Sequence, residues 1–406
     1  MLSYQSAGES HGKGLLALIN GFPAGLEINP EVINYELKRR QGGYGRGGRQ
    51  KLETDTAEIM TGIWGMTTIG SPISLWVKNK DYRLPDLPDL ATPRPGHGDL
   101  SGSRKYLSGM RAILERASAR ETAARVAAGG LARQLLSLLG IEVFGFTAQI
   151  AEVSLPMKKH AAELLTRLNQ PAGDGTELTA EQKEALEELR EMRDGNELYS
   201  LADEEANEKA MKRIDAAQAD GDTLGGVLEV WATGLPFGLG THAQWDAKLD
   251  GKLAQAVMAV QAMKGVEIGL GFEAAALPGS KVHDAIGFDP EKKQTRTLGF
   301  VRPTNRAGGL EAGMTNTQPL VLRAAMKPIA TLKKGLPTVD PLTRKPVSAC
   351  WERSDVCAVS AAGVVIENVT AFELAAAVVE KFGGDSVEEI RARYLLSMEL
   401  MRKLSS

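Results

Sequence analysis

The alternation of apolar and polar positions along the chain predicts a mixture of strands and helices. Apolar runs interrupted by Gly and Pro predict a strand, a loop and a second strand over Leu2–Leu26, and a hairpin over Ile59–Val77. Asn29 as N-cap, with a proline at the first helical position, predicts a helix over Pro30–Arg40. Four prolines in Asp81–Gly98 predict an irregular loop.

The clearest amphipathic helix is predicted over Ala119–Leu139, where alanines and leucines recur at helical spacing. Ser118 and Glu121 have the Ser-x-x-Glu spacing of a capping box at its start. The pattern further predicts a strand over Gly225–Trp231 and helices over Lys248–Met263, Phe372–Phe382 and Val387–Leu404. Because strands and helices interleave without regular βαβ units, an α+β fold is expected.

A highly charged segment interrupts this pattern in Glu177–Asp215, where 19 of 39 residues are charged. Its Glu and Lys residues recur at short spacing, which is typical of a solvated helical surface. We therefore interpret residues 1–406 as one domain that carries a charged helical insertion at about residues 157–219. Trimming this insertion between Glu181 and Lys209 is expected to leave folding intact.

The overall charge argues against a general binder of nucleic acid. Lys and Arg number 48 against 51 Asp and Glu, a net charge of −3, whereas such binders are basic overall. The two cysteines, Cys350 and Cys357, match no zinc-ligand spacing and are interpreted as reduced thiols. The N-terminal residues carry no targeting signal, and no apolar run approaches the ~18 residues of a membrane helix. We therefore expect a soluble cytoplasmic protein with no membrane partner.

Cations are nevertheless concentrated in one glycine-rich segment, Lys38–Lys51, which contains no acidic residue. Its arginines include Arg40, Arg46 and Arg49, and such a loop can wrap a small polyanion because guanidinium groups grip carboxylate or phosphate. An Arg-Gly segment that binds RNA is the weaker alternative, since there is one such unit and the chain is acidic. The three G-x-G-x-x-G/A matches are about what chance gives in so Gly-rich a chain, so Rossmann-type binding is not expected.

Two histidines flanked by glycines are candidates for proton transfer. His11 lies in Gly-Glu-Ser-His-Gly and His97 in Pro-Gly-His-Gly, and imidazole suits this chemistry near neutral pH. The alternative for each is a loop histidine bonded to backbone. No two histidines have the spacing of a zinc site, so no metal is expected. Three further segments could hold an anion or form ordinary surface ion pairs: Arg116–Ser118, Lys327–Thr331 and Arg353–Asp355.

Taken together, these segments resemble the chorismate synthase family over nearly the whole chain. Six of them follow in the family's order: Gly8–Gly12, Arg39–Arg49, Arg94–His97, Ser118–Thr122, Gly313–Asn316 and Arg353–Asp355. Each is weak alone, but six in this order are specific. The form of the basic segment and the charged insertion resemble the longer bacterial-type branch.

The resemblance implies a β-α-β sandwich fold and a lyase of the shikimate pathway, which leads to the aromatic amino acids. Such an enzyme removes phosphate and a ring proton, in an anti-1,4 elimination, from 5-enolpyruvylshikimate 3-phosphate to give chorismate. It requires reduced FMN, although the reaction has no net redox change. A substrate with a phosphate and two carboxylates suits a local arginine cluster on an acidic protein.

The resemblance assigns roles to matching residues of this sequence. His11, with Ser10 beside it, is the expected acid for the departing phosphate. His97 is expected to stabilise the anionic reduced flavin, and Asp355 to help the flavin take up the ring proton. Substrate is expected to be held by Arg40, Arg46, Arg49 and Arg120.

The family's cofactor-binding positions fall on a second set of residues. Arg40 and Arg46 match positions assigned to NADPH, a candidate reductant of the flavin. Flavin-contacting positions match Arg116, Ala117, Ser118, Gln261, Ala262, Ala312, Lys327, Pro328, Ile329, Ala330, Thr331 and Arg353. At Ala117 and Gln261 the family commonly has Ser and Asn, so one hydroxyl is lost and one amide is displaced.

The resemblance also implies a homotetramer. It leaves open whether the chain reduces its own flavin or depends on a separate flavin reductase. Another NADPH-dependent flavoenzyme, such as a flavin reductase itself, is the main alternative, and it would consume NADPH with each turnover.

Overall fold

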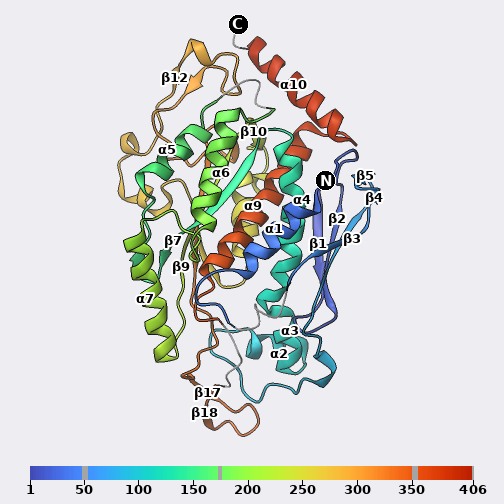
Figure 1. The fold of residues 1–406 in the computed structure, drawn as a ribbon, viewed down its shortest axis with the longest axis vertical. Helices are drawn as coiled ribbons and strands as arrows, with labels where there is room; N and C mark the ends of the chain where they lie inside the picture. Colours follow the sequence, from blue (N-terminus) through green and yellow to red (C-terminus); the bar gives the residue numbers. More distant parts are fainter. Residues whose placement is uncertain (48–53, 172–175, 350–354, 405–406) are drawn as a thin grey trace.

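The computed structural model describes residues 1–47, 54–171, 176–349 and 355–404. A layer of helices lies between two antiparallel sheets (Figure 1). The first sheet has the strand order β1 (Ser3–Ala7), β2 (Gly14–Asn20), β6 (Ile73–Lys78) and β3 (Ala57–Thr61). The second has the order β11 (Met263–Ile268), β16 (Leu320–Met326), β9 (Gly226–Thr233), β7 (Glu142–Ile150) and β8 (Val153–Ser154). The predicted α+β sandwich is confirmed.

Local signals account for the first sheet and the helix beside it. Along β2 the side chains of Leu15, Ala17 and Ile19 are fully buried, as expected for a strand with one face on the core. The helix α1 (Pro30–Gln41) begins as predicted, because the Asn29 side chain accepts a hydrogen bond from the second helical N–H at 3.0 Å. The predicted strand, loop and strand are also confirmed as β1 and β2.

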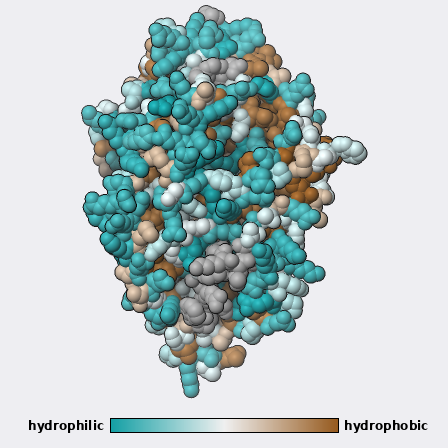
Figure 2. Space-filling view, viewed as in Figure 1, coloured by the Kyte–Doolittle hydropathy of each residue, from teal (hydrophilic) through white to brown (hydrophobic). Residues whose placement is uncertain are grey.

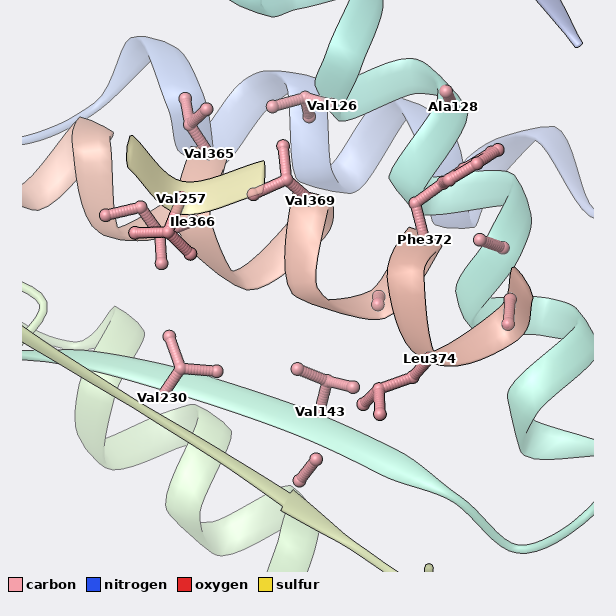
Figure 3. Packing of buried hydrophobic residues seen from close by; sticks show 14 of the residues in the cluster. Val126, Ala128, Val143, Val230, Val257, Val365, Ile366, Val369, Phe372 and Leu374 are labelled. Carbon is pink, nitrogen blue, oxygen red and sulfur yellow. The ribbon is translucent and has the colours of Figure 1, made fainter. Parts of the chain in front are cut away.

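The middle layer consists of α1, α4 (Thr122–Ser137) and α9 (Val359–Phe382). Two adjacent glycines of α4 let these helices approach closely: a Cβ atom at Gly129 would lie 2.4 Å from Asn368 of α9, and one at Gly130 would lie 3.0 Å from Ile33 of α1. Figure 3 shows α9 packed between α4 and the second sheet, with Val369 on the side of α4 and Leu374 on the side of β7.

The sequence predicted only the last part of α9, over Phe372–Phe382. Residues 359–371 are buried on nearly all sides, so they carry no amphipathic period to mark them as helical. Contrary to expectation, α9 is long and apolar enough to cross a membrane, the one such helix in the described part of the chain. However, 83% of its apolar window is buried within the fold, which is the environment of a core helix.

The start of α4 differs from the prediction. The chain first forms a 3-10 turn over Ala119–Glu121, and α4 begins at Thr122. The capping box does not form, because the Ser118 hydroxyl accepts from the backbone N–H of Arg120. The Glu121 carboxylate bonds to side chains of other segments instead, including the Ser6 hydroxyl. A tertiary contact therefore overrides the local pairing.

The remaining elements surround this core. The other helices outside the charged segment are α2 (Asp99–Tyr106), α3 (Met110–Ala117), α8 (Leu249–Met258) and α10 (Val387–Leu404). A third sheet contains β10 (Phe237–Gly240), β15 (Met314–Asn316) and β14 (Leu310–Glu311). Short two-stranded ladders pair β4 (Ile63–Trp64) with β5 (Thr67–Thr68), β12 (Gly287–Phe288) with β13 (Phe300–Val301), and β17 (Pro337–Val339) with β18 (Pro346–Ser348). The helix predicted over Lys248–Met263 ends at Met258, because the chain turns there and β11 begins at Met263.

The predicted insertion, which contains the charged segment, forms three helices along one side of the molecule, α5 (Lys159–Leu168), α6 (Ala180–Asp194) and α7 (Glu204–Asp220) (Figure 1). The interpretation of this segment as solvated surface is wrong for its inner face. Leu165 of α5 and Leu189 of α6 are buried in a second hydrophobic cluster together with Phe144 and Phe146 of β7. The charges that mark the sequence lie mainly on the outer face.

One cation of this segment is also part of the core. Arg193 of α6 is 1% exposed, and its guanidinium lies 4.6 Å from the centre of the Phe144 ring. Its Nη1 lies 3.5 Å from Glu367 Oε1, and this fully buried carboxylate on α9 also pairs with Arg39 at 3.0 Å and Arg133 at 2.9 Å. The charged segment therefore completes a buried ion network between α1, α4 and α9.

We expect Arg193→Ala to lower the free energy of unfolding by about 3 kcal/mol, because it removes one partner of a buried ion network. Lys209→Ala is the matched control, since Lys209 pairs with Glu205 on an exposed face, and it should cost less than about 0.5 kcal/mol. Urea denaturation midpoints compare the two variants. Equal midpoints, or normal folding after deletion of residues 181–209, would restore the original interpretation.

Candidate active site

A cavity of about 1140 Å³ gathers most of the residues that the sequence singled out. It exceeds the ~300–1,000 Å³ of most small-molecule sites, so it has room for more than one ligand. Its walls come from loops and helix ends far apart in the sequence, and they include Ser10, His11, Arg40, Arg46, His97, Ala117, Ser118, Arg120, Gln261, Ala262, Lys327, Ile329, Ala330, Thr331 and Asp355. In the described part of the chain, no three His, Cys, Asp or Glu side chains are placed to hold a metal ion.

Arg40 and Arg120 meet at one buried carboxylate, Asp55. Its Oδ2 accepts from Arg40 Nη2 and from Arg120 Nη1, each at 2.7 Å. Burial alone would raise the pKa of Asp55, but the two guanidinium groups outweigh it and lower this pKa. Burial lowers the pKa of Arg40 to about 10, and the charges of Arg120 and Arg46 add to this effect against the opposing charge of Asp55. The two guanidinium groups therefore share the single negative charge of Asp55, and the positive charge that is not neutralised favours binding of an anionic ligand.

Unsatisfied polar atoms support the same conclusion. Within the described residues, Arg40 Nε, Arg46 Nε and Arg120 Nη2 are buried without a hydrogen-bond partner. Arg83 and Lys327 also line the cavity, and burial together with the nearby charge of Lys264 lowers the pKa of Lys327. Buried N–H groups without partners are costly unless a ligand accepts from them. A ligand with several carboxylate or phosphate oxygens would satisfy them.

His11 is held by Glu115 of α3. The Glu115 carboxylate accepts from the His11 backbone N–H at 2.7 Å, and its other oxygen lies 2.9 Å from His11 Nδ1. On the other side of the ring, Asp81 Oδ2 lies 4.0 Å from Nε2. The loop that carries His11 begins at Gly8, whose φ of 108° favours glycine and where a Cβ would lie 2.3 Å from the carbonyl oxygen of Gly14.

His97 has a similar carboxylate partner, Asp99. Its Oδ1 lies 2.6 Å from His97 Nδ1, and the same carboxylate binds Arg94 through Nε at 2.8 Å and Nη2 at 2.9 Å. Burial would raise the pKa of Asp99, but its bonds to His97 and Arg94 hold this pKa well below its usual range. Arg94 also donates to Thr331 Oγ1 at 3.0 Å, which joins the His97 loop to the segment after β16.

Asp355 contacts Arg46 and Gly47 of the glycine-rich cationic segment that follows α1, which we call the basic loop. Its Oδ1 accepts from the backbone N–H of Gly47 at 2.6 Å, and its Oδ2 lies 3.1 Å from Arg46 Nη1. Ser10 also lines the cavity and is buried, and its hydroxyl accepts from the Ser118 hydroxyl at 3.1 Å. Imidazole, carboxylate and hydroxyl groups thus share one cavity with a cluster of cations, an arrangement that can bind a polyanion and move protons on it.

Gln261 fits a polar cofactor ring. Its Nε2 donates to Glu121 Oε2 at 3.2 Å, which orients the amide, while its buried Oε1 has no partner among the described residues. The neighbouring Ala262 lines the same wall. A ligand that donates hydrogen bonds, such as the ring system of a flavin, would satisfy the Gln261 oxygen.

Some of the predicted residues lie elsewhere. Arg116 is half-exposed and donates to the carbonyls of Ser6 and Gly8, so it anchors the end of β1 instead of lining the cavity. Ala312 lies in the exposed turn between β14 and β15, and Pro328 is also absent from the cavity wall. Three residues lie outside the described parts of the chain: Arg49, Arg353 and Cys350.

Sequence reasoning assigned no role to four residues that shape the site: Asp55, Arg94, Asp99 and Glu115. Arg94 and Asp99 flank His97 at short range, so that spacing could have indicated them. Asp55 follows a cationic segment that contains no acidic residue. The sequence therefore suggests that some carboxylate must offset the positive charge of this segment, but it does not indicate which carboxylate. No local signal marks Glu115 as the partner of His11, 104 residues away.

Comparison with known proteins connects this cavity to a known chemistry. A family profile described as chorismate synthase matches residues 2–379. Chorismate synthase of Geobacter sulfurreducens is 48% identical over 417 residues, covering 99% of this chain and 100% of that protein. The enzyme of Desulforamulus reducens is 50% identical over 406 residues, covering 97% of each. A crystal structure of chorismate synthase has a TM-score of 0.76 at 39% identity, covering 99% of this chain and 98% of that one.

Members of this family are lyases of the shikimate pathway to the aromatic amino acids, and they work with a reduced flavin. They convert 5-enolpyruvylshikimate 3-phosphate into chorismate by elimination of phosphate. The likeness extends over nearly the whole chain, so the chain belongs to the chorismate synthase family and acts on this small-molecule substrate.

Proposed function

We propose that this chain holds its substrate and reduced FMN together in the cation-lined cavity, where His11, His97 and Asp355 manage protons. The observation that carries the proposal is the convergence of two carboxylate-backed imidazoles, a carboxylate and several guanidinium groups on one space of about 1140 Å³. The substrate carries a phosphate and two carboxylates, whose negative charge is complementary to the cations that line the cavity.

Substrate is held by guanidinium groups of the α1 end and the basic loop. Arg40 and Arg120 are fixed in direction by Asp55, and Arg46 by Asp355. Their remaining N–H groups donate to phosphate and carboxylate oxygens, and Arg49 adds to this set by resemblance to the family. Preorganised cations stabilise the charge that develops on a departing phosphate without reorganising during the reaction.

A flavin would be held by the part of the wall formed by Ala117, Ser118, Gln261, Ala262, Lys327, Ile329, Ala330 and Thr331. The unsatisfied Gln261 oxygen and the Lys327 ammonium suit its polar ring and its phosphate. When bound, a reduced flavin would supply electron density to the substrate ring without net oxidation, which is why a reaction without net redox change would need a redox cofactor. Arg116, Pro328, Ala312 and Arg353 remain family-based candidates for this site.

The residues that transfer protons and stabilise charge are those that face both ligands. His11, beside Ser10, gives a proton to the departing phosphate, which makes it a better leaving group. His97 stabilises the negative charge of the reduced cofactor. Asp355 assists the loss of the ring proton from the position opposite the phosphate.

A homotetramer in the cytoplasm is the assembly that we infer. Large apolar side chains are exposed near the first sheet and on α10, including Met60, Trp64, Ile69, Leu396 and Leu400. Figure 2 shows hydrophobic residues gathered on the side where β3 to β5 lie, and such patches are typical of contacts between protein chains. The cytoplasm supplies the phosphorylated substrate and a reduced flavin.

An anaerobic assay with chemically reduced FMN tests the proposal. We expect chorismate to accumulate to many molecules per flavin, because the cofactor is regenerated in each cycle. Repeating the assay with oxidised FMN and NADPH as sole reductant shows whether the chain reduces its own flavin, through Arg40 and Arg46, or needs a separate reductase. Consumption of one NADPH per turnover would identify the chain as an ordinary flavin reductase and contradict the proposal.

We expect His11→Ala to lower kcat by about 10²-fold or more while FMN still binds, because a general acid is lost. FMN fluorescence quenching measures binding separately from turnover. His242→Ala is the control, since His242 is exposed and lies outside the cavity. Wild-type turnover in His11→Ala would remove this residue from the mechanism.

For Asp355→Asn we expect slower loss of the ring proton and a decrease in kcat of up to about 10-fold. The amide oxygen still accepts from the Gly47 N–H, so the basic loop keeps its anchor. With substrate deuterated at the reacting carbon, the isotope effect on kcat should be larger in the variant than in the wild type. An unchanged isotope effect together with an unchanged kcat would exclude Asp355 from proton removal.

A further inference from the structure

We propose that Glu115 is the positioning residue through which His11 acts: it holds the imidazole doubly protonated, with Nδ1 toward the protein interior and Nε2 toward the cavity. Nε2 is then ready to protonate the departing phosphate. This inference rests on the proposed function of His11 and adds the group that keeps the acid charged and aimed.

One carboxylate of Glu115 spans two N–H groups of His11. Its Oε2 accepts from the backbone N–H at 2.7 Å, and its Oε1 lies 2.9 Å from Nδ1. The backbone carbonyl of Glu115 accepts from the Ser10 N–H at 2.8 Å. The backbone carbonyl and the carboxylate of Glu115 therefore both fix the loop. The bidentate contact of the carboxylate sets the orientation of the imidazole ring.

Contacts other than those of Glu115 also hold the backbone around His11. Asn79 Nδ2 donates to the carbonyls of Glu9, Ser10 and Gly12 at 2.9–3.2 Å. The backbone N–H groups of Arg83 and Leu84 donate to the His11 carbonyl at 3.1 and 3.0 Å. A change at Glu115 should therefore alter the ring and its proton more than the course of the loop.

An ionised carboxylate only accepts hydrogen bonds, so both oxygens of Glu115 require N–H partners. His11 Nδ1 must then carry hydrogen, and a neutral ring would have none on Nε2. The negative charge of Glu115 favours binding of the second proton to the ring, at Nε2. In the reaction, the Nε2 proton passes to a phosphate oxygen as the electron pair of the C–O bond leaves with phosphate; the ring becomes neutral, keeps Nδ1–H on Glu115, and takes a new proton from solvent.

Other charges around His11 are weaker or already balanced. Asp81 lies 4.0 Å from Nε2 but is paired with Arg83 at 2.6 Å. Arg111 of α3 lies 3.9 Å from Glu115 Oε1, too far for a hydrogen bond. Further charges near this part of the chain are Glu9 on the same loop and Lys80 on the cavity wall. Burial would raise the pKa of Glu115, but its bonds to His11 and the charge of Arg111 lower it, so the carboxylate is ionised.

Asp99 provides a built-in comparison. It contacts His97 Nδ1 at 2.6 Å, yet Arg94 binds the same carboxylate twice and places Nη2 3.1 Å from that nitrogen. Its charge is thus largely offset by Arg94, whereas the charge of Glu115 is directed to His11. The two pairs resemble each other in geometry and differ in their capacity to retain a proton.

The experiment uses Glu115→Gln in the full-length protein labelled with ¹⁵N-histidine. An amide can accept from only one of the two N–H groups and presents a donor to the other, so the imidazolium is disfavoured. We expect the NMR titration midpoint of His11 to fall by about one pH unit or more. The alkaline limb of kcat/KM should move with it to lower pH. At pH 8, kcat should fall about 10-fold to 100-fold, with KM nearly unchanged, and should recover toward wild type near pH 6.

Two variants serve as controls. Asp99→Asn makes the same change beside the other histidine and should leave the His11 titration in place. Glu115→Asp keeps the charge and should shift the His11 midpoint less than Glu115→Gln. A midpoint and an alkaline limb that stay in place in Glu115→Gln would overturn the proposal, as would an equal shift in Asp99→Asn.

The wild-type protein provides a measurement that needs no variant to fold. In the neutral ring of His11, the ¹⁵N shifts should place the hydrogen on Nδ1, which lies 2.9 Å from Glu115 Oε1. Hydrogen on Nε2 alone would overturn the proposal. The failures are distinguishable. Normal turnover in His11→Ala would contradict the proposed function. If His11→Ala is inactive but the pH dependence of kcat/KM in Glu115→Gln equals that of the wild type, only the role of Glu115 is contradicted.

Discussion

Cations that share one cavity repel each other, and this site depends on buried carboxylates that offset the repulsion. A single oxygen of Asp55 accepts from both Arg40 and Arg120 at 2.7 Å, and Asp355 pairs with Arg46 at 3.1 Å. Each carboxylate neutralises part of the charge and fixes the direction of a guanidinium. Some N–H groups of these arginines remain buried without partners, and under the proposed function an anionic substrate would supply the missing negative charge.

The fold connects this balance of charge to the core through α1. Consecutive residues of its last turn face different environments: Arg39 enters the ion network with Glu36 and Glu367, and Arg40 lines the cavity. The glycine-mediated contacts of α4 with Ile33 of α1 and Asn368 of α9 hold α1 in the helix layer. A loss of packing in the helix layer would therefore reach the substrate-binding arginines, even though it starts far from the reacting atoms.

Sequence reasoning succeeded where the signal is local and failed where the partner is distant. The Asn29 cap and the glycine-flanked His11 and His97 are features of short segments, and resemblance to a family ordered those segments into one site. Glu115 lies 104 residues from His11, so no periodicity could pair them. Likewise, Arg193 looked like one more surface charge, because only the folded chain places it beside a buried carboxylate of α9.

The most direct test of the charge balance is a crystal structure with 5-enolpyruvylshikimate 3-phosphate and FMN bound together. The account predicts the substrate phosphate within hydrogen-bond distance of His11 Nε2, the substrate carboxylates on Arg40, Arg46 or Arg120, and the flavin against Gln261 and Lys327. Substrate bound away from these guanidinium groups, or a flavin on the far side of His97 from the substrate, would contradict it.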